Sequence, residues 1–409
     1  MIKKLNNYKI LFLLRLLKSI LNNFVDIFLV LYFIKVSNSN ILPLGIYKLV
    51  AMVTVWVVMF FTKNRCKENG RIHFMKIGIV LYFVYFLSII ILKEKVVDYI
   101  YLIGMLYGLE EGFYYSVYNM IESDGIDNKD RTKYVGVYTA VKNIVSIIFP
   151  LIFGGMIQKS GFINATIFAL FIVIFEIILS NLFKDNNIPK SNKTNFKEFK
   201  NIVKNNKGFK NIMVMKICSG LTYSEGALSY VITIYIIKVF SESISLGIFT
   251  SIFSVISVII GILFIKIIKN KYYVPLMIVT SFTTIVLLCI MLLNCNFITI
   301  VLYNLSQTIS KGLIDLINEK NIFGFSNIKA IKQEYKVEYF LSIETSLFIG
   351  RVISNVLFIL MAFTNTQFIM IIFVVFAIMY AASTIMLQIS MQKYTEININ
   401  NGKKLSTDN

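Results

Sequence analysis

The residues from Gly104 to Tyr138 read GMLYGLEEGFYYSVYNMIESDGIDNKDRTKYVGVY, and this stretch decides how the rest of the chain is interpreted. Glu110 and Glu111 stand next to each other inside its apolar half, among Met, Leu, Phe and Tyr. An ionisable group in the middle of a membrane-length segment is costly unless it faces a cavity or a partner. We therefore expect both glutamates to line the interior of a helical bundle in a membrane.

The composition supports a membrane protein. Of the 409 residues, 57% are hydrophobic and 15% are charged, whereas a soluble domain carries about 25% charged residues. Apolar runs long enough to cross a bilayer recur from end to end, and the short alternating segments of an outer-membrane barrel are not found. The sequence thus predicts an all-α polytopic membrane protein that spans the lipid bilayer.

The apolar runs predict twelve transmembrane helices in two six-helix halves. The expected domains are 1–183 for the first half, 184–210 for a basic cytoplasmic linker, 211–392 for the second half and 393–409 for a polar, disordered tail. The expected spans are 12–35, 41–62, 74–92, 97–121, 134–158, 162–183, 211–237, 244–268, 273–293, 297–318, 338–363 and 367–391.

The net charge of +19 comes mainly from Lys and Arg in the short connections between the apolar runs. That bias predicts a protein of the cytoplasmic membrane whose basic loops and two termini lie on the cytoplasmic side. No basic face is left over for a nucleic acid. In the linker, Phe196, Phe199, Ile202 and Val203 recur at helical spacing among lysines, which fits either an amphipathic helix on the inner membrane face or a solvated linker.

Charged side chains concentrate in spans 1, 4, 5, 7, 10 and 11. In span 1, Arg15, Lys18, Asn22 and Asp26 share one helical face; Arg15 and Lys18 lie near the cytoplasmic end, where they can snorkel to the interface. The candidate residues of a substrate and proton pathway are Asp26, Glu110, Glu111, Tyr115, Asn119, Lys142, Glu225, Lys311, Asp315, Glu344 and Arg351.

Some of these charges have a structural interpretation as well. Lys311 and Asp315 are four residues apart and can form a salt bridge, and Glu344 and Arg351 share a face two turns apart. Asp26, Glu110, Glu111 and Glu225 have fewer obvious local partners, which favours function. We interpret Glu176, in span 6, as a packing residue.

The architecture resembles the major facilitator superfamily over essentially the whole chain. The stretch from Gly108 to Ile157 is similar to a subgroup of permeases from low-GC Gram-positive bacteria. The matching residues are Gly108, Gly112, Phe113, Tyr114, Tyr115 and Asn119, then Asn128, Lys129, Asp130 and Arg131, then Pro150, Gly154 and Gly155. The loop KNRCKENGR, residues 63–71, departs from the superfamily pattern because Lys67 replaces an aspartate. The resemblance implies that this aspartate acts as a latch between the halves, so we expect another pair to serve.

The resemblance and the charges together predict a secondary transporter that moves a small molecule by alternating access. The buried carboxyls favour proton coupling, and their excess over the deep cations favours a cationic or amphipathic substrate and efflux, although Lys142, Lys311 and Arg351 could bind an anion. We expect a monomer without cofactor or metal. A transport-inactive sensor with the same fold stays open because of residues 63–71. A membrane-embedded enzyme is disfavoured because His73 is the only histidine.

Overall fold

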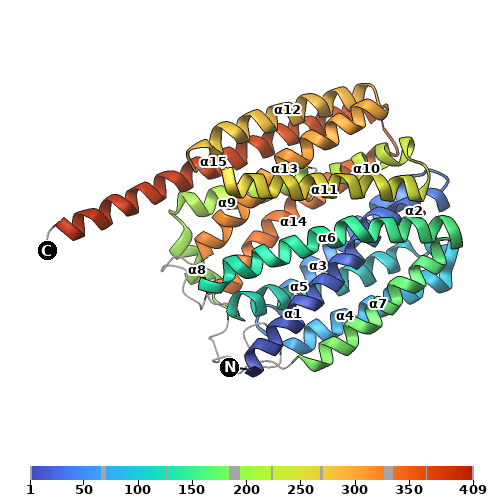
Figure 1. Ribbon diagram of the computed structural model, residues 1–409, viewed down its shortest axis with the longest axis horizontal. Helices are drawn as coiled ribbons and strands as arrows, with labels where there is room; N and C mark the ends of the chain where they lie inside the picture. The colour runs from blue at the N-terminus through green and yellow to red at the C-terminus, as the bar shows by residue number, and fades with distance from the viewer. Residues whose placement is uncertain are drawn as a thin grey trace. The chain divides into compact units, whose positions relative to one another are not determined.

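Every regular element of the described chain is a helix. The computed structural model describes residues 2–65, 71–125, 128–183, 194–222, 224–267, 270–326, 335–364 and 366–407, and no strand occurs over these ranges (Figure 1). Nine helices in the described part are long and apolar enough to cross a membrane. The all-α membrane fold predicted from the sequence is confirmed.

Three of the twelve predicted spans are not among those nine. They correspond to helix α5 (Ile100–Gly125), the pair α9 (Lys207–Leu221) and α10 (Leu228–Val239), and helix α13 (Phe297–Ser326). Each of these segments carries charged residues inside its apolar sequence, which lowers its mean hydropathy. The count of twelve stays a prediction.

The chain forms two compact units. The first contains residues 1–194, 230–258 and 355–366, and the second contains 195–229, 259–354 and 367–409. The first unit is built on α1 (Ile2–Asn23), a π-helical turn η1 (Phe24–Leu29), α2 (Val30–Val36), α3 (Leu42–Thr62), α4 (Ile72–Leu92), the short helix η3 (Lys93–Val97), α5, α6 (Asn128–Ser160) and α7 (Phe162–Leu182). It also holds most of α10 and the first part of α11 (Ser243–Ile267).

Helix α5 is the centre of the first unit, where it packs against both α3 and α4. Gly104, Gly108 and Gly112 form a stripe on the face that meets α3. A Cβ atom on Gly104 would lie 2.7 Å from the carbonyl oxygen of Tyr47, and one on Gly108 would collide with the carbonyl oxygen of Ala51. Small residues at a spacing of four allow two helix backbones to approach this closely. The stripe therefore fixes α5 against α3 and sets the direction in which Glu110 and Glu111 point.

Aromatic side chains fill the interior of the first unit, while the outside of its helices is apolar. The ring of Phe24 lies 4.8 Å from Phe153 and 5.5 Å from Phe162. On α7, Phe171 and Phe175 are exposed. Exposed apolar side chains along a helix of this length fit a lipid-facing surface.

The second unit contains α8 (Phe196–Val203), α9, the last part of α11, α12 (Tyr273–Leu293), α13, most of α14 (Lys336–Leu360) and nearly all of α15 (Thr366–Thr407). Helices α12 and α13 pack side by side (Figure 1). Helix α15 continues to Thr407, so the disorder predicted from residue 393 is wrong. The tail has no proline, and each residue added to an existing helix gains a backbone hydrogen bond.

Helix α8 packs its apolar face on protein. Phe199 and Val203 are buried, and the ring of Phe199 lies 5.6 Å from that of Phe209 and 6.3 Å from that of Tyr335. The backbone N–H of Asn195, at the start of α8, donates to Oε1 of Glu338 at 2.8 Å. This helix is therefore held by contacts within the second unit.

The predicted continuous span 211–237 is wrong, because the helix is interrupted. Helix α9 ends at Leu221 and α10 begins at Leu228. Glycine at 220 and 226 weakens the helix, and the backbone N–H of Gly226 turns back to the carbonyl oxygen of Thr222 at 2.8 Å. Glu225 therefore stands on a non-helical segment.

Candidate functional site

A lysine and two glutamates form a buried cluster in the first unit, which we call the triad: Lys18, Glu110 and Glu111. The Lys18 Nζ atom lies 2.6 Å from each carboxylate oxygen of Glu110 and 2.9 Å from Oε1 of Glu111. The side chains of Lys18, Glu110 and Glu111 are 2%, 0% and 18% exposed. The triad therefore places one cation against two carboxyls away from water.

The structure corrects the interpretation of Lys18. Sequence position alone suggested that this side chain snorkels to the membrane interface, whereas it points from α1 into the protein and reaches α5. Its partner Glu110 is 92 residues away in the sequence, so no local spacing indicated the pair. The partner of the two glutamates is therefore a distant residue and not a local one.

Tyrosine rings surround the ammonium group of the triad. The Lys18 Nζ atom lies 3.9 Å from the ring centroid of Tyr82, 5.5 Å from that of Tyr114 and 5.9 Å from that of Tyr115. Aromatic faces attract a cation, and more strongly where water is excluded. Asn22 links two of these rings, because its Nδ2 atom donates to the hydroxyl of Tyr115 at 3.4 Å and its Oδ1 atom accepts from that of Tyr82 at 3.5 Å. Tyr115 thus lies beside the triad.

Asp26 pairs with a lysine that sequence reasoning missed. Its Oδ1 atom lies 3.4 Å from Nζ of Lys48 on α3, and the two side chains are 59% and 5% exposed. Lys48 also lies 4.7 Å from the ring centroid of Tyr230. The signal was present in the sequence, since Lys48 is the one charged residue of the predicted span 41–62. Asp26 belongs to the π-helical turn η1, a distortion that often marks functional positions in helices.

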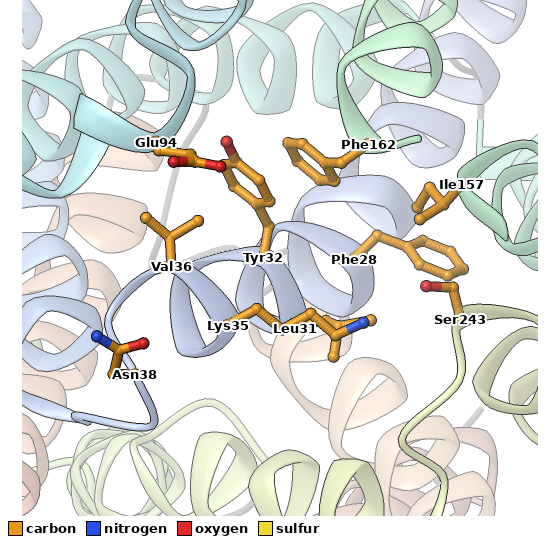
Figure 2. Close-up of a pocket in the computed structure, with 10 residues that line it drawn as sticks. All are labelled: Phe28, Leu31, Tyr32, Lys35, Val36, Asn38, Glu94, Ile157, Phe162 and Ser243. Atoms are coloured by element: carbon orange, nitrogen blue, oxygen red, sulfur yellow. The ribbon is translucent and has the colours of Figure 1, made fainter. Parts of the chain in front are cut away.

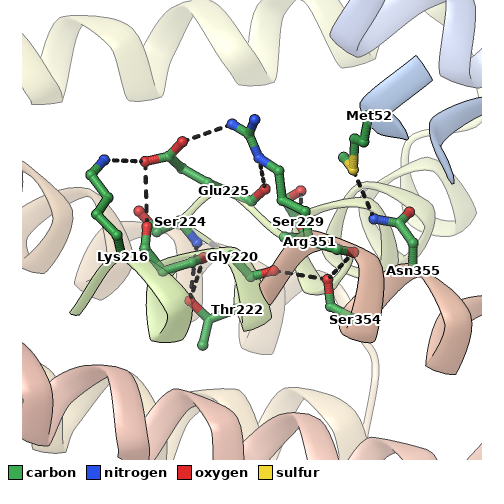
Figure 3. Close-up of polar contacts among 12 residues, drawn as sticks. Met52, Lys216, Gly220, Thr222, Ser224, Glu225, Ser229, Arg351, Ser354 and Asn355 are labelled. Carbon is green, nitrogen blue, oxygen red and sulfur yellow. Dashed lines mark hydrogen bonds and ion pairs between the residues drawn. The ribbon is translucent and has the colours of Figure 1, made fainter. Parts of the chain in front are cut away.

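A second cluster of charges lies in the second unit and consists of Lys216, Glu225 and Arg351 (Figure 3). Oε1 of Glu225 lies 2.9 Å from Nζ of Lys216, and Oε2 lies 2.7 Å from an Nη atom of Arg351. The Nε atom of Arg351 also donates to the carbonyl oxygen of Glu225 at 3.2 Å. The three side chains are 17%, 28% and 26% exposed, in the order Lys216, Glu225, Arg351. Here two cations hold one carboxylate.

Close packing of α9 on α14 supports this second cluster. A Cβ atom on Gly350 would collide with the carbonyl oxygen of Ile217, and one on Gly220 would lie 2.7 Å from the backbone nitrogen of Arg351. The hydroxyl of Ser354 donates to the carbonyl oxygen of Gly220 at 2.8 Å and accepts from the N–H of Ala227 at 3.2 Å. These contacts hold the end of α9 and the segment with Glu225 in place (Figure 3).

Three of the remaining predicted residues interact electrostatically with the second cluster: Glu344 with Lys216, Lys311 with Glu225, and Asp315 with both. Lys142 and Lys311 are exposed, and Asp315 and Glu344 are half-buried. No direct ion pair joins Lys311 and Asp315, both of which are described. The side chain of Asn119 and residues 66–70 of the loop 63–71 lie outside the described part of the chain.

A separate cavity of about 610 Å³ lies in the first unit. Its wall includes the stacked rings of Tyr32 and Phe162, with centroids 3.8 Å apart, and the exposed charges Lys35 and Glu94 (Figure 2). None of the predicted site residues lines it. In the described part of the chain, no group of His, Cys, Asp and Glu could hold a metal ion.

Comparisons with known proteins identify the family. Residues 10–314 match the model of the Major Facilitator Superfamily. An uncharacterised protein of Bacillus subtilis, YqgE, is 22% identical over 83% of this chain and 78% of its own length. An uncharacterised protein from the sodM 3' region of Geobacillus stearothermophilus is 24% identical over 34% of this chain and 64% of its own. Both sources fit the expected subgroup from low-GC Gram-positive bacteria.

Solved structures of transporters share the fold at low sequence identity. A bacterial homologue of the iron transporter ferroportin, in an inward-facing state, superposes with a TM-score of 0.64 at 13% identity, over 95% of this chain and 98% of its own. The nucleoside transporter NupG superposes with a TM-score of 0.64 at 13% identity, over 95% of this chain and 99% of its own. The human organic anion transporter MFSD10 superposes with a TM-score of 0.62 at 11% identity, over 94% of this chain and 99% of its own. The chain therefore belongs to the major facilitator superfamily, as a multi-pass membrane protein with the fold of its transporters.

Proposed function

We propose that the protein is a secondary active transporter that couples the movement of a small molecule to protons through the triad. The observation that carries this proposal is the burial of two carboxyls, Glu110 and Glu111, around the single cation of Lys18. A buried carboxyl without its own counter-charge favours the neutral, protonated form. One proton bound by the pair Glu110–Glu111 removes the excess negative charge of the triad.

Alternating access gives that proton a direction. In this fold the two halves move around a site near the middle of the membrane, which opens to one side at a time. Glu110 is fully buried whereas Glu111 is 18% exposed, so Glu111 is the member of the triad through which protons exchange with water. Asp26, at 59% exposed and paired with Lys48, is the second carboxylate of the pathway.

For the substrate we propose a cationic or amphipathic compound that is exported from the cytoplasm, with both termini of a monomer on the cytoplasmic side. A positive group would replace the proton as the counter-charge of the second carboxyl, and the tyrosine faces around Lys18 favour cations. The neighbours in fold are described as a homologue of an iron transporter, a nucleoside transporter and an organic anion transporter. Because these substrates differ in charge, the fold by itself does not narrow the class.

The test is proton movement in proteoliposomes that contain the purified protein and a pH-sensitive dye. Cationic drugs, sugars, peptides and organic anions are added one at a time under a pH gradient. We expect a cationic compound to trigger proton flux in the wild type. Glu110→Gln, Glu111→Gln and Asp26→Asn should each reduce that flux, because each removes a carboxyl of the proposed pathway.

Glu198→Gln is the matched control, since Glu198 is an exposed carboxylate on α8 and its loss should leave the flux unchanged. Undiminished flux in the three pathway variants would show that these carboxyls are structural. Saturable flux of any compound rejects the alternative of a transport-inactive sensor. Absence of proton flux with every class of compound would contradict proton coupling.

A further inference from the structure

Glu176 on α7 is a buried carboxyl that the proposed pathway does not use. Its side chain is 0% exposed, and neither of its carboxylate oxygens has a hydrogen-bond partner among the described residues. From the sequence alone, we interpret Glu176 as a packing residue. A packing role does not explain why a carboxyl, rather than an apolar side chain, stands at this position.

The surroundings of Glu176 connect it to the triad. It interacts electrostatically with Lys18 of α1, with Tyr82 of α4, and with Glu110 and Tyr114 of α5. Helix α7 packs directly against α1, α4 and α6. The hydroxyl of Tyr114 is also buried without a hydrogen-bond partner in the described part of the chain. Two unpartnered polar groups thus lie in one buried region beside Lys18.

The charges of this region do not balance if every group is ionised. Three carboxyls, Glu110, Glu111 and Glu176, interact with Lys18, whose Nζ atom is already in contact with Glu110 and Glu111. Lys48 also interacts with Glu111, but it is paired with Asp26. An ionised carboxylate that is buried without donors loses its hydration and receives nothing in exchange, so it takes up a proton instead.

We propose that Glu176 is a second proton-binding site, which holds a proton in the resting protein and exchanges it with Glu110. In the exchange, the O–H bond of Glu176 breaks and an O–H bond on Glu110 forms. One proton moves from one carboxyl to the other, so the net charge of the buried region is unchanged. This inference rests on the proposed proton coupling, and it adds a carboxyl on a helix outside the predicted pathway.

The direct test is infrared spectroscopy of the purified protein, which needs no substrate. A protonated carboxyl gives a carbonyl band that shifts on transfer to deuterated water. We expect the wild type to show this band at neutral pH, Glu176→Gln to lose the part that one carboxyl contributes, and Glu198→Gln to keep it. A band of unchanged area in Glu176→Gln would overturn the proposal.

A flux measurement separates this inference from the proposed function. Glu176→Gln has nearly the shape of the protonated acid, so it should fold and unfold like the wild type. We expect its proton flux in proteoliposomes, with the compound of the panel that drives flux in the wild type, to fall by at least about tenfold. Flux equal to the wild type in Glu176→Gln would overturn the exchange with Glu110 while proton coupling stands. Absence of flux in the wild type would contradict the proposed function, and the exchange with it, whatever the infrared band shows.

Discussion

The two charge clusters differ in sign and in contact with water. In the first unit, one lysine faces two glutamates, Glu110 is fully buried and the helices that carry the residues are continuous. In the second unit, two cations face Glu225, all three side chains are between 17% and 28% exposed, and Glu225 stands on a helix interruption. An excess carboxyl in a buried site can bind a proton. An excess cation near water is compensated by mobile anions and needs no proton.

The largest difference should appear when each lysine is removed. Lys18→Met leaves two carboxyls buried without a cation, and we expect a loss of about 3–5 kcal/mol in the free energy of unfolding. Lys216→Met leaves Glu225 bound to Arg351 in a half-exposed site, so its loss should be about 1 kcal/mol or less. Thermal unfolding in detergent measures both. Adding Glu110→Gln to Lys18→Met should restore part of the stability. Equal losses for the two lysines would refute the comparison.

Salt should change the stability loss of Lys216→Met but not that of Lys18→Met, and we expect this effect to be smaller than that of removing either the buried lysine or its charge. Raising the salt concentration from about 0.1 M to about 1 M shortens the Debye length from about 10 Å to about 3 Å. The gap in Tm between the wild type and Lys216→Met should narrow over this range, because that cluster is reached by water. The gap for Lys18→Met should stay constant. If the Lys18→Met gap also narrows, the triad is accessible to ions and its burial does not set its behaviour.

The smallest effect is expected for Tyr115→Phe. The ring of Tyr115 lies near Lys18, but its hydroxyl makes only a long hydrogen bond of 3.4 Å to Asn22. We expect a change in stability of less than about 1 kcal/mol. Tyr47→Phe is the comparison variant, since it leaves the buried Tyr85 hydroxyl without its 2.8 Å partner and should cost more. A larger effect for Tyr115→Phe would show that the shell of the triad acts through hydroxyls and not through ring faces.

Much of the fold could be predicted from the sequence, because the signal is local. Long apolar runs specify membrane helices, and the carboxyls at 110 and 111 stand out against their own segment. The sequence also grouped Lys216 and Glu225 in one span. The interruption between Leu221 and Leu228 could not be predicted from hydropathy, since the residues on both sides of it are apolar. Its only indications are the glycines at 220 and 226.

The partners in the candidate site could not be predicted because they are distant in the sequence. Glu110 meets Lys18 across 92 residues, and Glu225 meets Arg351 across 126. Helical spacing identifies which side chains share a face, but not which other helix that face meets. Spacing places Glu344 on the same face as Arg351, two turns away, whereas a carboxylate that Arg351 contacts directly is that of Glu225.

The glycine stripe of α5 also limits how the protein can move. Gly104 and Gly108 bring α5 so close to the backbone of α3 that the two helices cannot slide along each other without separating. Helices α3 and α5 therefore move as one body during a transport cycle. Gly78 brings α4 equally close to the backbone of α5, where a Cβ atom would lie 3.0 Å from the carbonyl oxygen of Glu110. We therefore expect any motion that brings water to Glu110 to come from α1. Distance probes placed across the α3–α5 contact should stay constant, and probes between α1 and α5 should report the opening.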